Sequence, residues 1–313
     1  MESLCPRGQD EPYELYELDE PPGGVFMQVI KADVLGFCFG VRRAVTMIET
    51  ELEEHGPLCT LGAIVHNTHV VESLTEKGAR LVHGLDDVLP AKAVAITAHG
   101  AGEEVYAAIR ESGLRLVDTT CPIVRRAQQT AATLVKEGFF VIVYGEAEHP
   151  EVKGILSWTA GQGIATQTPD VEIPDGTTGI AVIAQTTKNP QQFAKFAEGA
   201  TRAFARRVPE IRIVNTTCPE TGRRYQAGSD LAKKVDVILV VGSRSSANTR
   251  KLADTCNATG VPTHHIESSD EIEDSWFAGC SRCGVTAGAS TPDEVIEDVV
   301  CRLNEEKGES CRT

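Results

Sequence analysis

The chain has 313 residues, of which 41% are hydrophobic, and a formal net charge of −15. This length allows a substantial buried core and two or three domains. No apolar run approaches the roughly 18 residues of a membrane-spanning helix, and the acidic balance argues against nucleic acid as a partner, because phosphate backbones are bound by clustered Lys and Arg.

Residues 1–27 are acidic and poorly patterned, and they lack the basic start and apolar stretch of a secretory signal. We therefore expect a disordered acidic leader, a short tail at 306–313 and a cytoplasmic protein that does not bind membranes. The ten cysteines of such a chain favour reduced thiols and metal ligation over disulfides.

From Met27 onward, short β-branched runs alternate with amphipathic stretches. The spacing of Val41, Ala44, Ile48 and Leu52 predicts a helix that ends at Gly56. A further helix is expected to open at 66–67, after the Cys59–Ile64 segment. Later strands are expected at Ala93–Thr97, Phe140–Tyr144, Ile180–Ala184, Val235–Val241 and Val285–Ala287. This alternation predicts an α/β fold with largely parallel sheets.

Three cysteines occur in similar local sequences: Cys38 in GFCFGVRR, Cys121 in TTCPIVRR and Cys218 in TTCPETGRR. Each follows a β-like run and precedes a helical pattern, so each lies at a strand-to-helix turn. The three thiolates come from separate αβ units and can meet only at a central point. Thiolates favour iron–sulfur, zinc or cuprous sites, and an iron–sulfur cluster with three Cys ligands would keep one iron free for substrate.

The repeated cysteine pattern also predicts the domain organisation. We expect three similar αβ domains at 28–120, 121–215 and 216–305, the first with Cys38, the second starting at Cys121 and the third with Cys218.

Hydrogen-bonding side chains follow most of the predicted strands. Histidines, hydroxyls and an amide occur in these loops, whereas a Walker phosphate-binding loop is missing from the sequence. Ligands of open α/β sheets bind beyond the carboxyl ends of strands. These hydrogen-bond donors suit a compact anion, and a diphosphate without a nucleotide fits them best.

Seven motifs occur in a family's order: GFCxGV, HNxxVV, AHG, TCP, HPEVxG, QTT and VTAGAS. On these motifs the chain, from about Val29 to Leu303, resembles the 4-hydroxy-3-methylbut-2-enyl diphosphate reductases, the LytB-type iron–sulfur reductases. The resemblance implies a trefoil of three αβ domains around a central [4Fe-4S] cluster. It also implies an oxidoreductase of isoprene biosynthesis that forms isopentenyl and dimethylallyl diphosphate, the last step of the methylerythritol phosphate route.

The resemblance assigns residues by position. It implies that Cys38, Cys121 and Cys218 bind one cluster that has one open iron, and that Glu151 and Thr186 deliver the proton to the leaving hydroxyl. It implies reduced ferredoxin or flavodoxin as the electron donor. The implied diphosphate-binding residues are His66, His99, His149, Ser246, Asn248 and Ser290.

Two positions depart from the family pattern. Ala247 replaces a small hydroxyl residue, and the run after Cys218 differs from the usual CxATxxRQ. Two other functions stay open: an iron–sulfur sensor that has lost catalysis, and a zinc hydrolase of phosphate esters.

Other candidate residues receive structural interpretations. Cys280 and Cys283 have the spacing of a zinc or redox half-site, but no second pair accompanies them. The arginine doublets after the cysteines are either solvated helix faces or a positive rim for an acidic electron donor. Inert or surface roles are expected for Cys59, Cys256, Cys301, His55, His69, His83, His264 and His265.

Overall fold

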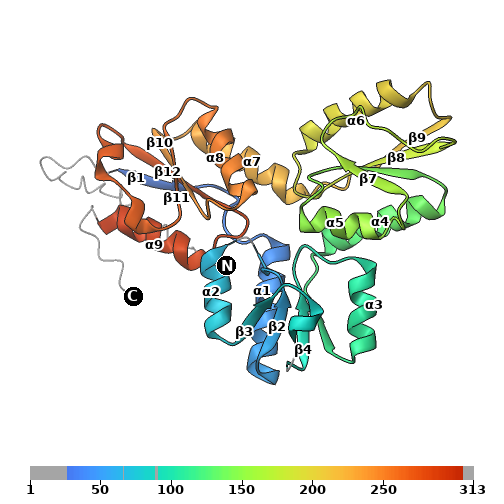
Figure 1. Cartoon of the computed structure of the whole chain (residues 1–313). Helices are drawn as coiled ribbons and strands as arrows, with labels where there is room; N and C mark the ends of the chain where they lie inside the picture. Colours follow the sequence, from blue (N-terminus) through green and yellow to red (C-terminus); the bar gives the residue numbers. More distant parts are fainter. Residues whose placement is uncertain (1–26, 66, 89–90, 306–313) are drawn as a thin grey trace, which may run out of the picture.

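The computed structural model describes residues 27–65, 67–88 and 91–305. The expected leader at 1–27 lies outside the described residues except for Met27, and the expected tail at 306–313 lies wholly outside them. In the described part, three four-stranded parallel sheets form three αβ units around a central point (Figure 1). The predicted α/β class and trefoil arrangement are confirmed.

The first unit joins four strands, three helices and a short 3-10 turn. Its sheet has the order β3-β2-β4-β5. The elements are α1 (Phe39–His55), β2 (Leu58–Leu61), α2 (Thr68–Glu76), β3 (Ala79–Val82), η1 (Leu85–Val88), β4 (Ala93–Ile96), α3 (Glu103–Ser112) and β5 (Arg115–Asp118).

The second unit repeats this arrangement with the sheet order β7-β6-β8-β9. Its elements are α4 (Pro122–Lys136), β6 (Phe140–Tyr144), α5 (Pro150–Ser157), β7 (Gly163–Thr166), β8 (Gly179–Ala184), α6 (Pro190–Phe204) and β9 (Glu210–Ile213).

The third unit contains the C-terminal elements and the first strand of the chain. Its sheet has the order β1-β12-β10-β11. The elements are β1 (Gln28–Lys31), α7 (Pro219–Ala232), β10 (Val237–Val241), α8 (Ala247–Asn257), β11 (Thr263–Ile266), η2 (Ser269–Glu271), η3 (Asp274–Phe277), β12 (Arg282–Ala287) and α9 (Asp293–Glu305).

Strand β1 completes the third sheet in the place that β5 and β9 occupy in the other two. It pairs in parallel with β12, and Gln28 lies opposite Arg282. Residues 28–31 therefore lie in the sheet of the C-terminal segment and not with the sheet of the 28–120 range. Local sequence patterns do not predict this pairing, because β1 and β12 are far apart in the sequence. The division at 120/121 and 215/216 stays a prediction.

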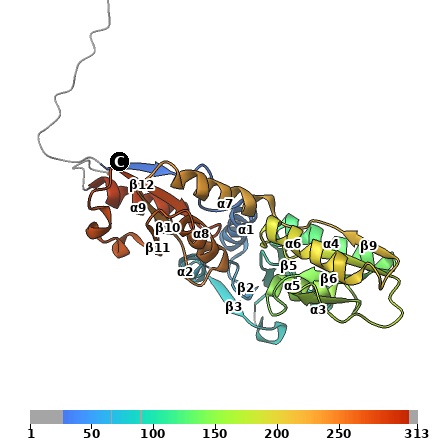
Figure 2. The same ribbon diagram turned by 90° about the horizontal axis from the view of Figure 1, so that it is seen from above.

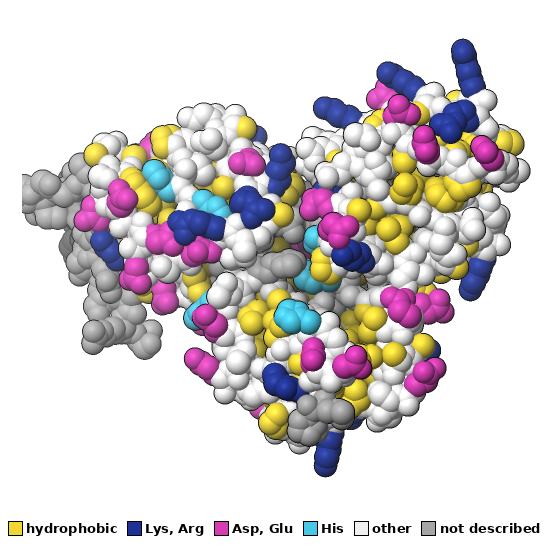
Figure 3. Space-filling model, in the orientation of Figure 1, with side chains coloured by type: hydrophobic (Ala, Val, Ile, Leu, Met, Phe, Trp, Pro, Cys, Tyr) yellow, Lys and Arg dark blue, Asp and Glu magenta, His cyan; other side chains and the backbone are white. Residues whose placement is uncertain are grey.

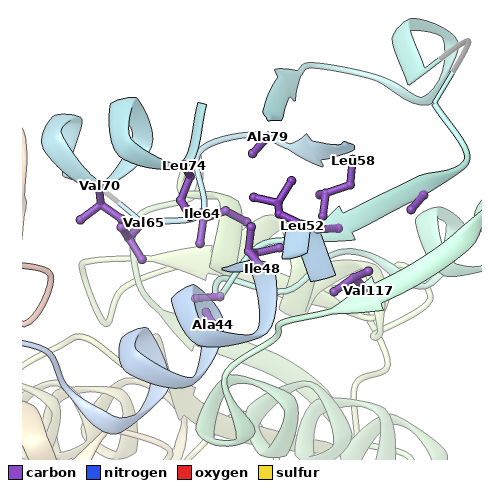
Figure 4. Packing of buried hydrophobic residues seen from close by; sticks show 13 residues of the cluster. Ala44, Ile48, Leu52, Leu58, Ile64, Val65, Val70, Leu74, Ala79 and Val117 are labelled. Carbon is purple, nitrogen blue, oxygen red and sulfur yellow. The ribbon is translucent and has the colours of Figure 1, made fainter. Parts of the chain in front are cut away.

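The cores explain why these segments fold as they do. Strands β6, β8 and β10 are buried along nearly their whole length, as expected for parallel strands covered by helices on both faces. In the first unit, Ile48 and Leu52 of α1 pack on Leu58 of β2 and Val117 of β5 (Figure 4). Removing such a buried side chain costs about 2–5 kcal/mol.

The local predictions hold in most places. Helix α1 ends at His55, and Gly56 follows it with φ +82°. The five predicted strands coincide with β4, β6, β8, β10 and β12, with small differences at their ends. In two perpendicular views, α7 lies between the elements of the second and third units, and in the first view α1 runs down into the first unit (Figures 1 and 2). Within the described ranges, none of the helices combines the length and apolarity needed to cross a membrane.

Candidate active site

The strand order of the three sheets determines where their ligand-binding loops lie. In each sheet all strands run in the same direction, but the order in which the chain adds strands reverses between the two middle strands, β2/β4, β6/β8 and β10/β12. Loops after such neighbouring strands diverge and open a crevice. All the polar residues implied by the family resemblance follow these six strands, whereas the three cysteines follow the edge strands β1, β5 and β9.

Each of these cysteines is the residue before a helix. Cys38, Cys121 and Cys218 are the N-caps of α1, α4 and α7. All three line one cavity, so the structure brings together the three residues that the sequence analysis singled out. The space-filling view shows histidines and hydrophobic side chains where the three lobes meet (Figure 3).

Gly40 indicates how closely two of the cysteines approach. A Cβ atom at Gly40 would lie 2.6 Å from the Cys121 sulfur and 4.0 Å from the Cys38 sulfur. The two sulfurs are therefore no farther apart than the sum of these distances. Glycine is required at position 40, two residues after Cys38, because a Cβ atom there would clash with the Cys121 sulfur.

The environment of the sulfurs suits thiolate ligands. Burial raises the pKa of the Cys121 thiol, and the N–H groups of Ile123 and Val124 in the first turn of α4 lower it. Burial likewise raises the pKa of Cys218, against the N–H groups of Glu220 and Thr221. Helix N-termini attract negative charge, so they stabilise the sulfurs once these are deprotonated by a metal.

The spacing of the cysteines distinguishes between kinds of metal centre. Within the described ranges, no three His, Cys, Asp or Glu side chains are arranged to hold a single ion. A mononuclear zinc site needs its ligands about 2.0–2.3 Å from one atom. A polynuclear iron–sulfur cluster binds one thiolate per iron and accepts sulfurs that are farther apart. Three thiolate ligands from three helix N-termini are compatible with such a cluster.

Glu151 is a buried carboxyl group in the cavity wall. It lies in the first turn of α5, is 1% exposed and accepts a hydrogen bond from the N–H of Thr186 at 2.5 Å. Burial raises its pKa to about 7, although hydrogen bonds from the N–H and hydroxyl of Thr186 and the charge of Lys188 act in the opposite direction. The group is therefore able to hold and release a proton near neutral pH.

Thr186 connects this carboxyl group to a cysteine. Its carbonyl accepts a hydrogen bond from the N–H of Cys218 at 2.7 Å. The loop after β8 thus fixes both Glu151 and the start of α7. The structure places Glu151 and Thr186 together, as the sequence analysis expected.

Two histidines lie next to each other at the cavity. The rings of His99 and His149 are 5.6 Å apart in an edge-on arrangement. Nδ1 of His149 accepts a hydrogen bond from the N–H of Glu151 at 3.1 Å. Because Nδ1 accepts, the proton of the neutral ring is on Nε2, which is then a donor for an anion. His66 lies outside the described residues; its neighbour Val65 lines the cavity.

The third unit contributes three small polar residues to the cavity. Ser246 is the N-cap of α8 and accepts a hydrogen bond from the N–H of Thr249 at 3.3 Å, while Asn248 follows in the first turn. Ser290 comes after β12 and is 8% exposed. Of the six expected diphosphate-binding residues, all except His66 lie in the described part of the chain. Four of these five line the cavity: His99, Ser246, Asn248 and Ser290. His149 contacts the ring of His99.

Arg224 is a residue of the cavity wall that the sequence did not predict. The arginine doublets were interpreted as solvated faces or a positive rim, but Arg224 is 4% exposed, lines the cavity and donates to the carbonyl of Ala287 at 2.8 Å. Burial lowers its pKa, and the nearby Cys38, Glu220 and Cys218 raise it. A buried arginine beside sulfur ligands offsets part of their negative charge. Its spacing of three, four and seven residues from Ala227, Gly228 and Leu231, which lie on the buried face of α7, is the signal that was available.

None of the other cysteines and histidines given structural interpretations is among the residues that line the cavity in the described part of the chain. Cys283 is fully buried in the core of the third unit, and Cys280 packs against the same core. Cys59 and Cys256 are buried, whereas Cys301 is only half-buried. His69 is exposed, His264 stacks on Trp276 at 3.9 Å, and Nε2 of His265 donates to the carbonyl of Gly242.

The chain has known relatives along nearly its whole length. The sequence profile of the LytB protein family matches residues 29–304. A 4-hydroxy-3-methylbut-2-enyl diphosphate reductase of Dehalococcoides mccartyi (strain CBDB1) is 44% identical over 280 residues, which are 89% of this chain and 98% of that protein. The enzyme of the same name from Geobacter sp. (strain M21) is 41% identical over 89% of this chain and 97% of its own length.

Solved structures agree with these relatives. A structure of (E)-4-hydroxy-3-methyl-but-2-enyl diphosphate reductase, the terminal enzyme of the non-mevalonate pathway, has a TM-score of 0.70 at 36% identity and covers 90% of this chain and 100% of that one. The Plasmodium falciparum E-1-hydroxy-2-methyl-but-2-enyl-4-diphosphate reductase has the same fold, with a TM-score of 0.80 at 24% identity, over 89% of this chain and 88% of its own. A three-unit α/β fold with cysteines, histidines and a buried carboxyl group around one cavity defines an iron–sulfur oxidoreductase class. Within that class, the chain belongs to the LytB protein family.

Proposed function

We propose that this protein catalyses the reductive dehydroxylation of 4-hydroxy-3-methylbut-2-enyl diphosphate to isopentenyl and dimethylallyl diphosphate. The reaction consumes two electrons and two protons and releases the hydroxyl group as water. The observation that supports it best is one cavity that combines three cysteines with the buried carboxyl group of Glu151. The family membership and the names of the relatives agree with this activity.

The polar residues of the cavity would hold the diphosphate. His99 and His149, on neighbouring loops of two units, present ring N–H groups, and Ser246, Asn248 and Ser290 approach from the third unit. The N-terminus of α8 adds backbone N–H groups, which favour a negative ligand. His66 is proposed for the same role from the family pattern alone. A substrate whose diphosphate is held by residues of all three units would have its allylic end near the cysteines, because these line the same cavity.

Glu151 would supply the proton that turns the leaving hydroxyl into water. Hydroxide leaves poorly without a proton, and a general acid contributes roughly 10²–10⁴-fold when its pKa is near the working pH. With a pKa of about 7, Glu151 meets this condition. Thr186 would hold the carboxyl group in position through its N–H and hydroxyl.

Cys38, Cys121 and Cys218 would hold one [4Fe-4S] cluster with an open iron, and Gly40 leaves the space beside the Cys121 sulfur free. When bound, such a cluster supplies electrons and a Lewis-acidic iron for the allylic oxygen. Reduced ferredoxin or flavodoxin is the proposed electron donor, and a cytoplasmic location stays a prediction.

A sensor that keeps the cluster without catalysis is the second candidate, but Glu151 argues against it. Binding a cluster gives no reason to bury a carboxyl group of raised pKa beside the anion-binding histidines.

The test is turnover with a chemical donor. The full chain, purified without oxygen and assayed for iron and sulfide, is mixed with the hydroxylated diphosphate and reduced methyl viologen. We expect both isoprenoid diphosphates as products. Iron-loaded protein that leaves the substrate unchanged would favour the sensor, and zinc in place of iron would favour the hydrolase.

A further inference from the structure

Gln128 places a polar side chain where the pattern of its helix predicts an apolar one. The other buried residues of α4 are Val124, Ala127, Ala131 and Leu134, and Gln128 lies among them by helical spacing. Its side chain is fully buried. Burying an amide costs free energy unless its polar ends form hydrogen bonds, so the contacts of this side chain explain its position.

The amide nitrogen of Gln128 reaches the first unit. Its Nε2 donates to the carbonyl of Ala101 at 3.1 Å, and Nε1 of Trp158 donates to the same carbonyl at 3.3 Å. Gly100 makes room for this contact, because a Cβ atom there would lie 2.6 Å from Nε2 of Gln128. His99 precedes Gly100 and lines the cavity. Two donors of the second unit therefore hold the backbone directly after a residue of the cavity wall.

Helix α5 packs at the same point. It lies with α4 on the side of the second unit that faces the first (Figure 1). A Cβ atom at Gly154 of α5 would lie 3.2 Å from Nε2 of Gln128 and 3.5 Å from the carbonyl carbon and oxygen of Ala101. The backbones of α4, α5 and the His99 loop thus converge on one amide group. Because His149 is the N-cap of α5, this junction relates the two histidine rings, whose centres are 5.6 Å apart.

The orientation of the amide follows from the partner of its oxygen. Oε1 of Gln128 accepts a hydrogen bond from Nη1 of Arg125 at 3.4 Å. A guanidinium group only donates, so the amide oxygen faces Arg125 and the amide nitrogen faces Ala101. Nη2 of Arg125 pairs with Asp118 and donates to the hydroxyl of Tyr106 at 2.7 Å. Both of these partners belong to the first unit, which therefore fixes Gln128 at both polar ends.

We propose that Gln128 is a positioning residue of the reductase, which holds the His99 loop so that His99 and His149 bind the same diphosphate. The inference rests on the proposed function, because it concerns the proposed diphosphate site. Gln128 is not among the described residues that line the cavity, so it acts through the carbonyl of Ala101. Without its N–H group, that carbonyl keeps only the hydrogen bond from Trp158, and the His99 ring is no longer held at a fixed distance from His149. The site then binds the anion less tightly, because a charge-assisted hydrogen bond depends on distance and angle.

The test uses the full iron-loaded chain. Gln128→Met removes both polar ends at a similar side-chain length, whereas Gln128→His keeps a ring N–H donor and a ring nitrogen acceptor. Gln192→Met is the matched control at an exposed position of α6, and Phe204→Leu is a control that only loosens the core beneath α6. The measured quantities are the Kd of inorganic pyrophosphate by calorimetry, the viologen-driven KM and kcat for the hydroxylated diphosphate, iron content and urea unfolding.

We expect Gln128→Met to raise Kd and KM on the order of tenfold, the value of one weakened hydrogen bond to a charged group, while kcat and iron content stay nearly unchanged. Gln128→His should recover part of the affinity. Gln192→Met should match the unchanged protein, and Phe204→Leu should lower the free energy of unfolding without changing Kd.

Three results would overturn the proposal. The first is an unchanged Kd in Gln128→Met, and the second is the same raised Kd in Gln128→Met and Gln128→His. The third is an equal rise of Kd in Phe204→Leu, because general loosening of the protein would then explain the effect. If Gln128→Met does not fold, Gln128→Asn decides, since its shorter side chain keeps the amide but withdraws it from Ala101, and it should raise Kd in the same way.

The outcomes separate this proposal from the proposed function. A protein that binds pyrophosphate but leaves the hydroxylated diphosphate unchanged would refute the reductase function, and the Kd values would still decide the role of Gln128. A protein that reduces the substrate, with a Kd that ignores Gln128→Met, would refute the positioning role alone. A protein that binds no pyrophosphate would refute the diphosphate site and the positioning role together.

Discussion

The carboxyl group of Glu151, in the first turn of α5, accepts a 2.5 Å hydrogen bond from the backbone N–H of Thr186, in the loop after β8. Thr186 accepts in turn from Cys218. This chain of contacts ties the proposed proton donor to a proposed cluster ligand, so the two functions of the site share one rigid loop.

Replacing Glu151 by Gln should remove the transferable proton while keeping the size and burial of the side chain. We expect turnover with methyl viologen to fall by roughly 10²–10⁴-fold, the usual contribution of a general acid. Iron content and the visible spectrum should stay unchanged. Loss of iron in Glu151→Gln would mean that the residue supports the loop and does not act on the substrate.

The raised pKa of Glu151 predicts a pH dependence. The protonated form exists below a pKa of about 7, so turnover should fall as the pH rises through about 7. The folded pKa also lies above the ordinary value of 4.5, so the free energy of unfolding of the metal-free protein should fall as the pH rises from 4.5 to about 7. A viologen-driven pH–rate profile and urea titrations at several pH values measure both effects. A profile without the alkaline decline would contradict the assignment.

Gly40 should tolerate no side chain. In Gly40→Ala the new Cβ would lie 2.6 Å from the Cys121 sulfur, closer than real contacts allow. We expect a folded protein, judged by circular dichroism, that retains little iron after anaerobic reconstitution. Gly84→Ala is the control, because a Cβ there meets no atom within 4 Å. Full iron content in Gly40→Ala would show that the sulfurs are farther from this position when the metal is bound.

Arg224 should be needed for stability. Arg224→Met removes the donor to the Ala287 carbonyl, and a lost hydrogen bond from a charged group costs about 1.5–3 kcal/mol. Urea unfolding of the metal-free protein measures this change. Arg223→Met at the exposed neighbour should alter the free energy of unfolding by less than about 0.5 kcal/mol. Equal changes in the free energy of unfolding for the two substitutions would indicate that the buried position of Arg224 does not stabilise the protein.

Local patterns predicted most of the fold. The spacing of apolar residues located α1 and the five named strands, and the repeated cysteine turns predicted three units that meet at one point. The position of β1 was missed because strand pairing across the whole chain leaves no trace in local periodicity. Arg224 was missed because an arginine doublet on an amphipathic helix looks solvated until the packing of α7 against β12 of the same unit buries it. His99, Glu151 and Thr186 follow predicted strands, but their roles were implied by the family resemblance and stay predictions.

The central claim is that cysteines from three units bind one cluster with an iron available to substrate. Mössbauer spectra of iron-57-loaded protein, recorded with and without the hydroxylated diphosphate, test it most directly. We predict a cluster in which one iron differs from the others and changes its signal when substrate is added. Four equivalent irons that ignore the substrate, or a protein that binds zinc and no iron, would contradict the account.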